Sequence, residues 1–270
     1  PVNQALFSPD ARRILTLCRD GFARLWNRAD GTPVAGAAWS IRVTHYDETL
    51  TPAASFSPDG GRVITVGETG VWIWDAATGG PAMPSPDPSS AYKHAAFSPD
   101  GRLVVAASAA GPVRVWSLEP GGARLLGVHE HPGGAFYALF SPDGRSVASA
   151  GADAAVAVWD PRTGRELLPP LRHKSSVRIA EAVFSPAGDR LLSLSFDHSV
   201  IVWNALTGVP ESHMTLSAVG VPVAKWDPRG ERIISGSFDG MARVWDARTG
   251  QAAGPMLPHG RYVVDVASAP

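Results

Sequence analysis

Serine, histidine and aspartate occur together at Ser149, His131 and Asp153, a combination that could carry out acyl-transfer chemistry. In serine hydrolases the aspartate orients the histidine, and the histidine removes the proton from the nucleophilic hydroxyl. The same three residue types recur further along the chain, at Ser193, His173 and Asp197. An enzyme needs one such site, whereas a fold built from repeats needs the same internal contact in each repeat. The recurrence therefore favours a structural role for both sets.

Metal and thiol chemistry have weaker signals. His129 and His131 lie two residues apart, so on a strand they would share a face, but no third ligand is evident. The one cysteine, Cys18, excludes an internal disulfide and a multi-cysteine metal site. It stands beside Arg19, yet we interpret it as an inert small residue rather than a reactive thiol. No phosphate-binding glycine motif, zinc motif or nucleophile elbow is present, so we expect no cofactor and no metal.

The composition excludes several classes of partner. The chain has 270 residues, of which 44% are hydrophobic and 18% charged, as in a packed domain. With 24 basic and 25 acidic residues the net charge is −1, so nothing draws the chain to nucleic acid or to an anionic membrane. No apolar run is long enough to span a bilayer, and no signal peptide is visible. Together with the single cysteine, these features favour a cytoplasmic location. The alternative is a soluble domain of a membrane-anchored parent.

Tryptophans recur at nearly constant intervals. The gaps are 48, 42, 43, 44 and 42 residues between Trp26, Trp74, Trp116, Trp159, Trp203 and Trp245. An aromatic residue, mostly within the tetrapeptide FSPD, precedes each of them by 19 residues, or by 18 in the second unit: Phe7, Phe56, Phe97, Phe140, Phe184 and Trp226. A fixed period of about 40–45 residues indicates one supersecondary unit repeated along the chain.

Within a unit, short β-rich runs alternate with turns. In residues 222–250 the runs are separated by turns that contain Pro, Asp and Gly, which supply the backbone conformations that tight turns need. This pattern is typical of antiparallel strands, and a fourth strand is expected before the next unit begins. Four-stranded units repeated around a ring make a β-propeller, which also protects the sheet edges. We therefore predict an all-β fold.

The unit also resembles that of a known family. Residues 239–246, DGMARVWD, are similar to the WD-repeat signature DGxVRxWD, and residues 153–160 and 197–204 are close copies. The chain is therefore identified as a member of the WD-repeat β-propeller family, of the kind found in bacterial repeat arrays. The resemblance implies four-stranded antiparallel blades within a single domain, residues 1–270. The blades are expected at about 1–49, 50–90, 91–133, 134–177, 178–219 and 220–261, with a partial seventh at 262–270.

The family pattern implies a hydrogen-bonded network inside each blade, made by a Trp, a Ser or Thr, an Asp and a His. Besides the six tryptophans, the expected members are Thr16, Thr65, Ser149, Ser193, Ser235, Asp20, Asp153, Asp197, Asp239, His131 and His173. The third unit departs most, because Ala106, Ala110 and Pro88 replace its hydroxyl, Asp and His. We expect this blade to be the least firmly held, since buried polar groups need partners.

Six full units are followed by what looks like the start of another. The sequence from His259 resembles a first strand, and residues 268–270, SAP, stand where FSP is expected. We therefore predict a fragment of a longer, seven-bladed array. The alternative is a six-bladed ring with a loose tail.

In this family, the turn residues before the blade Asp and the starts of the first strands lie at one rim of the ring, which commonly binds partners. Aromatic residues and Arg often anchor protein interfaces. The resulting partner-binding candidates are Phe196, Phe238, Arg178, Phe136, Arg19 and Tyr262. In the alternative interpretation, these aromatic side chains pack on neighbouring loops.

We thus expect a non-catalytic scaffold that binds protein or peptide partners, monomeric as a domain, and forming the propeller part of a larger bacterial signalling protein. One alternative is a propeller enzyme, similar to a hydrolase or lactonase, working at the central channel. Its candidate residues share the position three before the recurring aromatic: His94, Glu181 and Asp265. Another alternative is a sensor that binds a small ligand in the channel, which the sequence neither supports nor excludes.

Overall fold

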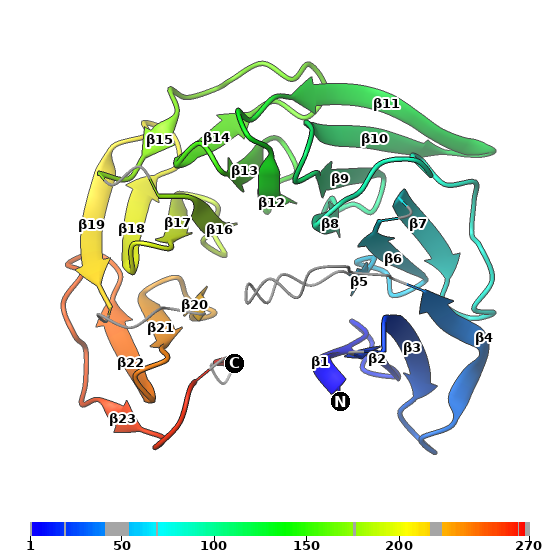
Figure 1. The fold of residues 1–270 in the computed structure, drawn as a ribbon, viewed down its shortest axis with the longest axis horizontal. Helices are drawn as coiled ribbons and strands as arrows, with labels where there is room; N and C mark the ends of the chain where they lie inside the picture. The colour runs from blue at the N-terminus through cyan, green and yellow to red at the C-terminus, as the bar shows by residue number, and fades with distance from the viewer. Residues whose placement is uncertain are drawn as a thin grey trace.

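The structure is built from β-strands in antiparallel sheets. The computed structural model describes residues 2–18, 20–40, 54–68, 70–174, 177–216, 223–263 and 265–267. Over these residues the strands form six sheets, five of four strands and one of three. Figure 1 shows the sheets side by side around a common centre, as the blades of a propeller, which confirms the predicted fold class. None of the described residues forms a helix long and apolar enough to cross a membrane.

Each blade is made of consecutive strands, numbered from the centre outward. Blade 1 contains β1 (Val2–Phe7), β2 (Arg13–Cys18), β3 (Phe22–Asn27) and β4 (Pro33–Ser40). Blade 2 contains β5 (Ala54–Phe56), β6 (Arg62–Gly67) and β7 (Gly70–Asp75). Blade 3 contains β8 (His94–Phe97), β9 (Leu103–Ala107), β10 (Val113–Glu119) and β11 (Gly122–His129).

The other three blades have the same order of strands. Blade 4 contains β12 (Ala135–Phe140), β13 (Val147–Gly151), β14 (Ala155–Trp159) and β15 (Leu171–Arg172). Blade 5 contains β16 (Ile179–Phe184), β17 (Arg190–Ser195), β18 (Ser199–Asn204) and β19 (Pro210–Thr215). Blade 6 contains β20 (Val223–Trp226), β21 (Arg232–Gly236), β22 (Met241–Asp246) and β23 (Leu257–Pro258).

The turn after the first strand is held by its own side chains. In blade 3, Ser98 Oγ donates to Asp100 Oδ1 at 2.6 Å and accepts from Leu103 N at 2.8 Å. Gly101 has a φ of +68°, a backbone conformation that glycine adopts without strain. Similar Ser–Asp contacts follow the first strands of blades 1, 2, 4 and 5. The repeated turn therefore starts the second strand at the same place in each of these blades.

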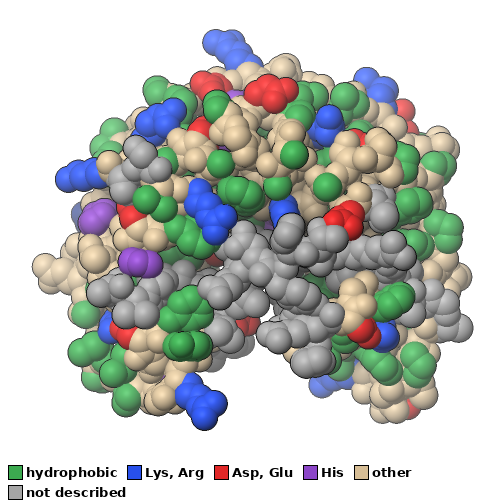
Figure 2. Space-filling view, in the orientation of Figure 1, with side chains coloured by type: hydrophobic (Ala, Val, Ile, Leu, Met, Phe, Trp, Pro, Cys, Tyr) green, Lys and Arg blue, Asp and Glu red, His purple; other side chains and the backbone are tan. Residues whose placement is uncertain are grey.

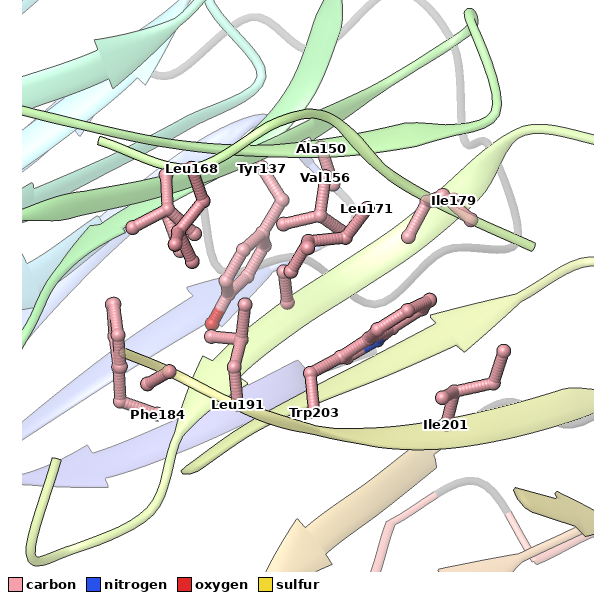
Figure 3. Packing of buried hydrophobic residues seen from close by; sticks show 14 residues of the cluster. Tyr137, Ala150, Val156, Leu168, Leu171, Ile179, Phe184, Leu191, Ile201 and Trp203 are labelled. Atoms are coloured by element: carbon pink, nitrogen blue, oxygen red, sulfur yellow. The ribbon is translucent and has the colours of Figure 1, made fainter. Parts of the chain in front are cut away.

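Apolar side chains fill the space between neighbouring blades. Figure 3 shows the cluster between blades 4 and 5, where Tyr137, Phe184 and Trp203 pack with aliphatic residues from both sheets. Phe140 and Phe184, each the recurring aromatic that ends a first strand, are only 6% exposed. Burying a side chain of this size contributes roughly 1.5–3 kcal/mol. These contacts therefore fix how one blade sits against the next.

Blade 2 has three strands among the described residues, and the Pro/Ser-rich stretch 81–90 runs along its outer edge. Two isolated bridges join this stretch to the third strand, between Val71 and Asp87 and between Trp74 and Pro81. Proline has no N–H to donate, so a stretch with four prolines cannot complete a regular ladder. The stretch thus takes the place of a fourth strand without forming one.

The residues after blade 6 bear on the predicted seventh unit. Val263 N donates to Ser237 O at 3.0 Å, just as Ala135 N, at the start of blade 4, donates to Ser108 O of blade 3 at 2.9 Å. Val263 therefore has the contact expected where a first strand begins. Residues 265–267 form no strand, and residues 264 and 268–270 lie outside the described part of the chain, so the seventh blade stays a prediction.

Candidate functional site

The third-strand tryptophan of a blade is hydrogen-bonded to a hydroxyl on the second strand. Across the described residues the indole Nε1 donates at 2.8–3.0 Å in these pairs: Trp26 to Thr16, Trp74 to Thr65, Trp159 to Ser149, Trp203 to Ser193 and Trp245 to Ser235. In blade 3 the corresponding position is Ala106, which has no hydroxyl. The bond joins the two middle strands of a blade through side chains as well as through the backbone.

Blade 4 contains the Ser, His and Asp set with its geometry complete. His131 Nε2 lies 2.8 Å from Ser149 Oγ, and His131 Nδ1 lies 3.1 Å from Asp153 Oδ1. Partial burial opposes ionisation of Asp153, but the hydrogen bond and charge of His131 and hydrogen bonds from backbone N–H groups together outweigh it and lower the pKa of the carboxyl. Ser149 is fully buried and its Oγ also accepts from the Trp159 indole, so a substrate carbonyl has no path to it. The geometry is that of a buried hydrogen-bonded network that joins neighbouring strands of the blade.

Blade 5 uses the same residue types with one addition. His173 Nε2 lies 2.7 Å from Ser193 Oγ, and its Nδ1 lies 2.8 Å from Ser199 Oγ. Ser199 Oγ donates in turn to Asp197 Oδ1, which is itself 3.9 Å from His173 Nδ1. Ser199 thus connects the imidazole to the carboxylate. The one sign of this role in the sequence is a hydroxyl two residues after the Asp, where blade 4 has Ala155.

In blades 1 and 6 an arginine on the third strand pairs with the blade Asp. Arg24 Nη2 lies 2.6 Å from Asp20 Oδ2, and Arg243 Nη2 lies 2.7 Å from Asp239 Oδ2. Both arginines stand two residues before the tryptophan. The sequence itself distinguishes these blades from the two that contain a histidine, because the latter have an apolar residue at the same position: Ala157 and Ile201.

Blade 3 replaces the missing network with other residues. Tyr92 is 3% exposed, and its hydroxyl donates to Asp87 Oδ2 at 2.9 Å and accepts from Arg114 Nη1 at 2.7 Å. Its ring meets the Trp116 ring edge-on, with centroids 6.0 Å apart. Partial burial opposes ionisation of Asp87, but hydrogen bonds from Ser89 and Tyr92 outweigh it and lower the pKa to about 2. Blade 3 thus has polar contacts that replace the missing members: Tyr92 and Asp87 lie outside the family pattern, whereas Arg114 occupies the arginine position of the signature, two residues before Trp116. The expectation that this blade is the least firmly held stays a prediction.

Three of the predicted partner-binding residues lie together at the seam between blades 4 and 5, and we call Phe136, Arg178 and Phe196 the rim cluster. The guanidinium carbon of Arg178 lies 4.0 Å from the centroid of the Phe196 ring and 5.6 Å from that of Phe136. All three residues are partly exposed. The cluster is anchored by a backbone hydrogen bond, since Phe196 N donates to Arg178 O at 3.2 Å. Arginine stacked on aromatic rings keeps its donors in a fixed plane.

Of the remaining rim candidates, the structure describes two, Phe238 and Tyr262. Phe238 and Tyr262 meet edge-on with ring centroids 5.1 Å apart, and Tyr262 is 71% exposed. Arg19 lies outside the described residues. The aromatic side chains of the rim thus contact their neighbours, as the alternative interpretation holds, and still present partly exposed surface.

Comparison with known families tests the resemblance in the sequence. The model of the family described as "WD domain, G-beta repeat" matches residues 1–27, 124–160, 167–204 and 211–246, together more than half of the chain. The chain belongs to the WD-repeat family. Repeats of this family generally mediate protein–protein interaction, and their propellers are typically non-catalytic. Comparison with curated proteins gave no match.

The channel candidates of the enzyme alternative lie on or beside the inner strands of this WD-repeat chain. His94 Nδ1 lies 2.8 Å from the backbone oxygen of Ala138 in the next blade, and burial lowers the pKa of His94 to about 4. Burial raises the pKa of Glu181 to about 7. Asp265 forms an ion pair with Lys225. His94 is thus engaged with a neighbouring blade and Asp265 with a lysine.

The histidine pair that could suggest a metal is also engaged. The His129 ring stacks on Trp159 with centroids 5.3 Å apart, and meets the His131 ring edge-on at 5.2 Å. Within the described ranges, no group of three or more His, Cys, Asp or Glu side chains is placed to hold a metal ion.

Replacing Ser149 with alanine removes the partner of two buried groups, the Trp159 indole and the His131 imidazole. A buried polar group left unpaired costs about 1–3 kcal/mol. We expect Ser149→Ala to lower the free energy of unfolding by roughly 2–4 kcal/mol in urea titrations. Ser235→Ala, which removes the partner of the Trp245 indole, should cost less. Equal losses in the two variants would contradict the double role of Ser149.

Tyr92→Phe removes the hydroxyl that joins Asp87 to Arg114. Since this hydroxyl is buried and bonded to charged groups, we expect the free energy of unfolding to fall by about 1–2 kcal/mol. The matched control, Tyr262→Phe, changes an exposed hydroxyl and should alter it by less than about 0.5 kcal/mol. An unchanged stability for Tyr92→Phe would leave blade 3 as the least firmly held blade, as the sequence predicts.

The buried His94 predicts a pH effect. Its pKa falls from 6.5 in the unfolded chain to about 4 in the folded chain, so the unfolded chain takes up the proton first as the solution is acidified. The stability that this residue contributes is therefore present above pH 6.5 and is lost as the pH falls toward 4. Glu181 acts in the opposite sense, because its raised pKa favours the folded chain at lower pH.

The test compares two variants with the unmodified chain, so that the contributions of all other titrating groups to the pH dependence cancel. Between about pH 7 and pH 4.5, His94→Gln should lose less free energy of unfolding than the unmodified chain, measured by urea titration at each pH. His213→Gln is the control, because that side chain is exposed on β19. Identical pH profiles for His94→Gln and the unmodified chain would show that His94 does not fold in the neutral form.

Proposed function

We propose that this WD-repeat chain is a non-catalytic interaction module that binds protein or peptide partners through the rim cluster and the neighbouring Phe238–Tyr262 pair. The observation that carries the proposal is the contact of the Arg178 guanidinium with two partly exposed phenylalanine rings, whose centroids lie 4.0 and 5.6 Å from its central carbon. Arginine and aromatic residues at a partly exposed, pre-organised position are the usual anchors of protein interfaces.

The burial of the possible nucleophiles supports a binding role over a catalytic one. Ser149 and Ser193 are fully buried, and each accepts a hydrogen bond from a tryptophan indole. A hydrolase needs its nucleophile within reach of a substrate and next to donors for the oxyanion. In this chain the same arrangement holds strands together instead.

The wider setting is part of the proposal. We infer a cytoplasmic domain that is monomeric by itself and belongs to a larger bacterial signalling protein. A nearly balanced charge supports partners other than nucleic acid or anionic membranes. Figure 2 shows basic and acidic side chains interspersed around one face, without a single charge covering it.

The test uses a rim variant and a matched control. Phe196→Ser removes an aromatic anchor of the rim cluster, whereas Leu206→Ser removes an apolar side chain that is 81% exposed in the turn after β18, at the opposite end of that strand. Each tagged protein is incubated with a lysate of cells that contain the chain naturally, and the bound proteins are quantified by mass spectrometry. We expect Phe196→Ser to lose at least about tenfold of a specific partner's signal, and Leu206→Ser to retain it.

Melting temperatures of both variants serve as the folding control. A partner that binds equally well to Phe196→Ser and to the unmodified chain contradicts the proposal. Loss with Leu206→Ser alone would place the binding surface at the opposite end of the strands.

A further inference from the structure

We propose that Glu181 and Asp265 compete for Lys225 at the inner strand of blade 6, so that a proton on Glu181 decides how firmly the segment after that blade is held. We call this segment, residues 261–263 and 265–267, the exit segment. A device of this kind goes beyond the proposed function, because it regulates one part of the chain by pH and is not itself a surface for a partner.

Lys225 lies between two carboxyl groups that come from neighbouring parts of the ring. Lys225 belongs to β20, the inner strand of blade 6, and Glu181 to β16, the inner strand of blade 5. Asp265 belongs to the exit segment, and Figure 1 shows β16, β20 and the end of the chain in this order around the centre. Glu181 and Asp265 also share one position of the repeat, three residues before the recurring aromatic or its equivalent. The two carboxyl groups therefore approach Lys225 from opposite sides of blade 6.

The structure shows Lys225 engaged with one of the two. Its Nζ donates to Asp265 Oδ1, and the two side chains are 49% and 65% exposed. Ion pairs this exposed are weak, because water competes for both charges. A second carboxylate near Lys225 can therefore weaken the pair.

Glu181 is the group that can supply this competing charge. Lys225 and Asp265 act on it through their charges, but within the described ranges neither forms a hydrogen bond with its carboxyl. Burial, together with the Asp265 carboxylate, raises the pKa of Glu181 to about 7 against the opposing effect of Lys225. Tyr137, from β12 of blade 4, also faces Glu181 and stays neutral, since burial and the Glu181 charge both raise its pKa. Glu181 therefore changes its charge near neutral pH.

The protonation of Glu181 acts on the exit segment in one direction. Below its pKa of about 7 the carboxyl is neutral, and Lys225 pairs with Asp265 alone. Above that pH the Glu181 carboxylate attracts Lys225 and repels Asp265, and both effects loosen the segment. The coupling is reciprocal, because a bound Asp265 favours the protonated form of Glu181. Lower pH should therefore hold the exit segment more firmly.

Val263 provides the other attachment of the exit segment and makes its release measurable. Its N–H donates to Ser237 O at 3.0 Å, and its side chain packs over Gly236, where a Cβ would lie 2.7 Å from Val263 Cγ1. Tyr262, the preceding residue, meets the Phe238 ring with centroids 5.1 Å apart. Loosening of the exit segment would thus free the Val263 amide and separate the two rings.

The experiment measures hydrogen–deuterium exchange of the full chain at about pH 6 and pH 8, corrected for the intrinsic exchange rate at each pH. The Val263 amide reports on the exit segment, and the Ala135 amide, which makes the corresponding bond to Ser108 O, is the internal reference. The variants are Glu181→Gln, which imitates the protonated carboxyl, and Lys225→Gln. The matched control is Glu231→Gln, whose exposed carboxyl lies in the turn before β21.

We expect the protection of the Val263 amide to fall by about fivefold between pH 6 and pH 8 in the unmodified chain and in Glu231→Gln. Glu181→Gln should keep the higher protection at both pH values, and Lys225→Gln should show the lower protection at both. The protection of the Ala135 amide should stay the same throughout.

A second measurement follows the Glu181 carboxyl itself by carbon NMR. Lys225→Gln should raise the pKa of Glu181, because it removes the positive charge that favours ionisation, and Asp265→Asn should lower it. This readout does not depend on how the exit segment exchanges.

Several results would overturn the inference. A loss of Val263 protection that persists in Glu181→Gln, or that is equally large at Ala135, would show that Glu181 is not the switch. A pKa of Glu181 that stays the same in Lys225→Gln and Asp265→Asn would show that the three groups are not coupled. None of these results bears on partner binding at the rim cluster, which Phe196→Ser tests separately.

Discussion

The hydrogen bond from a third-strand indole to a second-strand hydroxyl holds the middle strands of a blade in one register, and the described residues show it in all blades except the third. A buried indole N–H or hydroxyl left alone would cost free energy, so each group stabilises the fold by satisfying the other. The bond also fixes the turn that joins the two strands. In blade 5 that turn contains Phe196, so the hydrogen bond between Trp203 and Ser193 also positions the rim cluster.

The rest of each network varies, because the physical requirement is a partner for the carboxylate and not a particular residue. Blade 4 uses His131, blade 5 inserts Ser199 between histidine and carboxylate, and blades 1 and 6 use an arginine. Blade 3 has neither the hydroxyl nor the Asp, and a buried tyrosine bonded to Asp87 and Arg114 occupies the space beside its tryptophan. These substitutions keep buried polar groups paired while changing what is left at the surface.

The period of the sequence predicts the strands well, since turn residues and tryptophans are local signals. It predicts much less about contacts between segments. Tyr92 reaches Arg114 across 22 positions, and the pattern of one unit contains no sign of that pairing. The positions of the turns indicate the rim candidates, but the contact of Arg178 with phenylalanine rings of two different blades depends on how the blades pack. The four prolines of residues 81–90 predict that this stretch forms no regular ladder of hydrogen bonds in blade 2. That the stretch lies along the outer edge of the blade does not follow from its composition.

We propose that partners bind at the rim where blades 4 and 5 meet. Hydrogen–deuterium exchange of the chain, free and bound to a partner captured through Phe196, tests it most directly, because it reports on the native protein residue by residue. The account predicts slower exchange of the amides of residues 177–179 and 196–198 in the complex, and unchanged exchange at residues 204–208, at the opposite end of the same blade. Slower exchange confined to residues 204–208, or to the turns that follow the first strands, would contradict it.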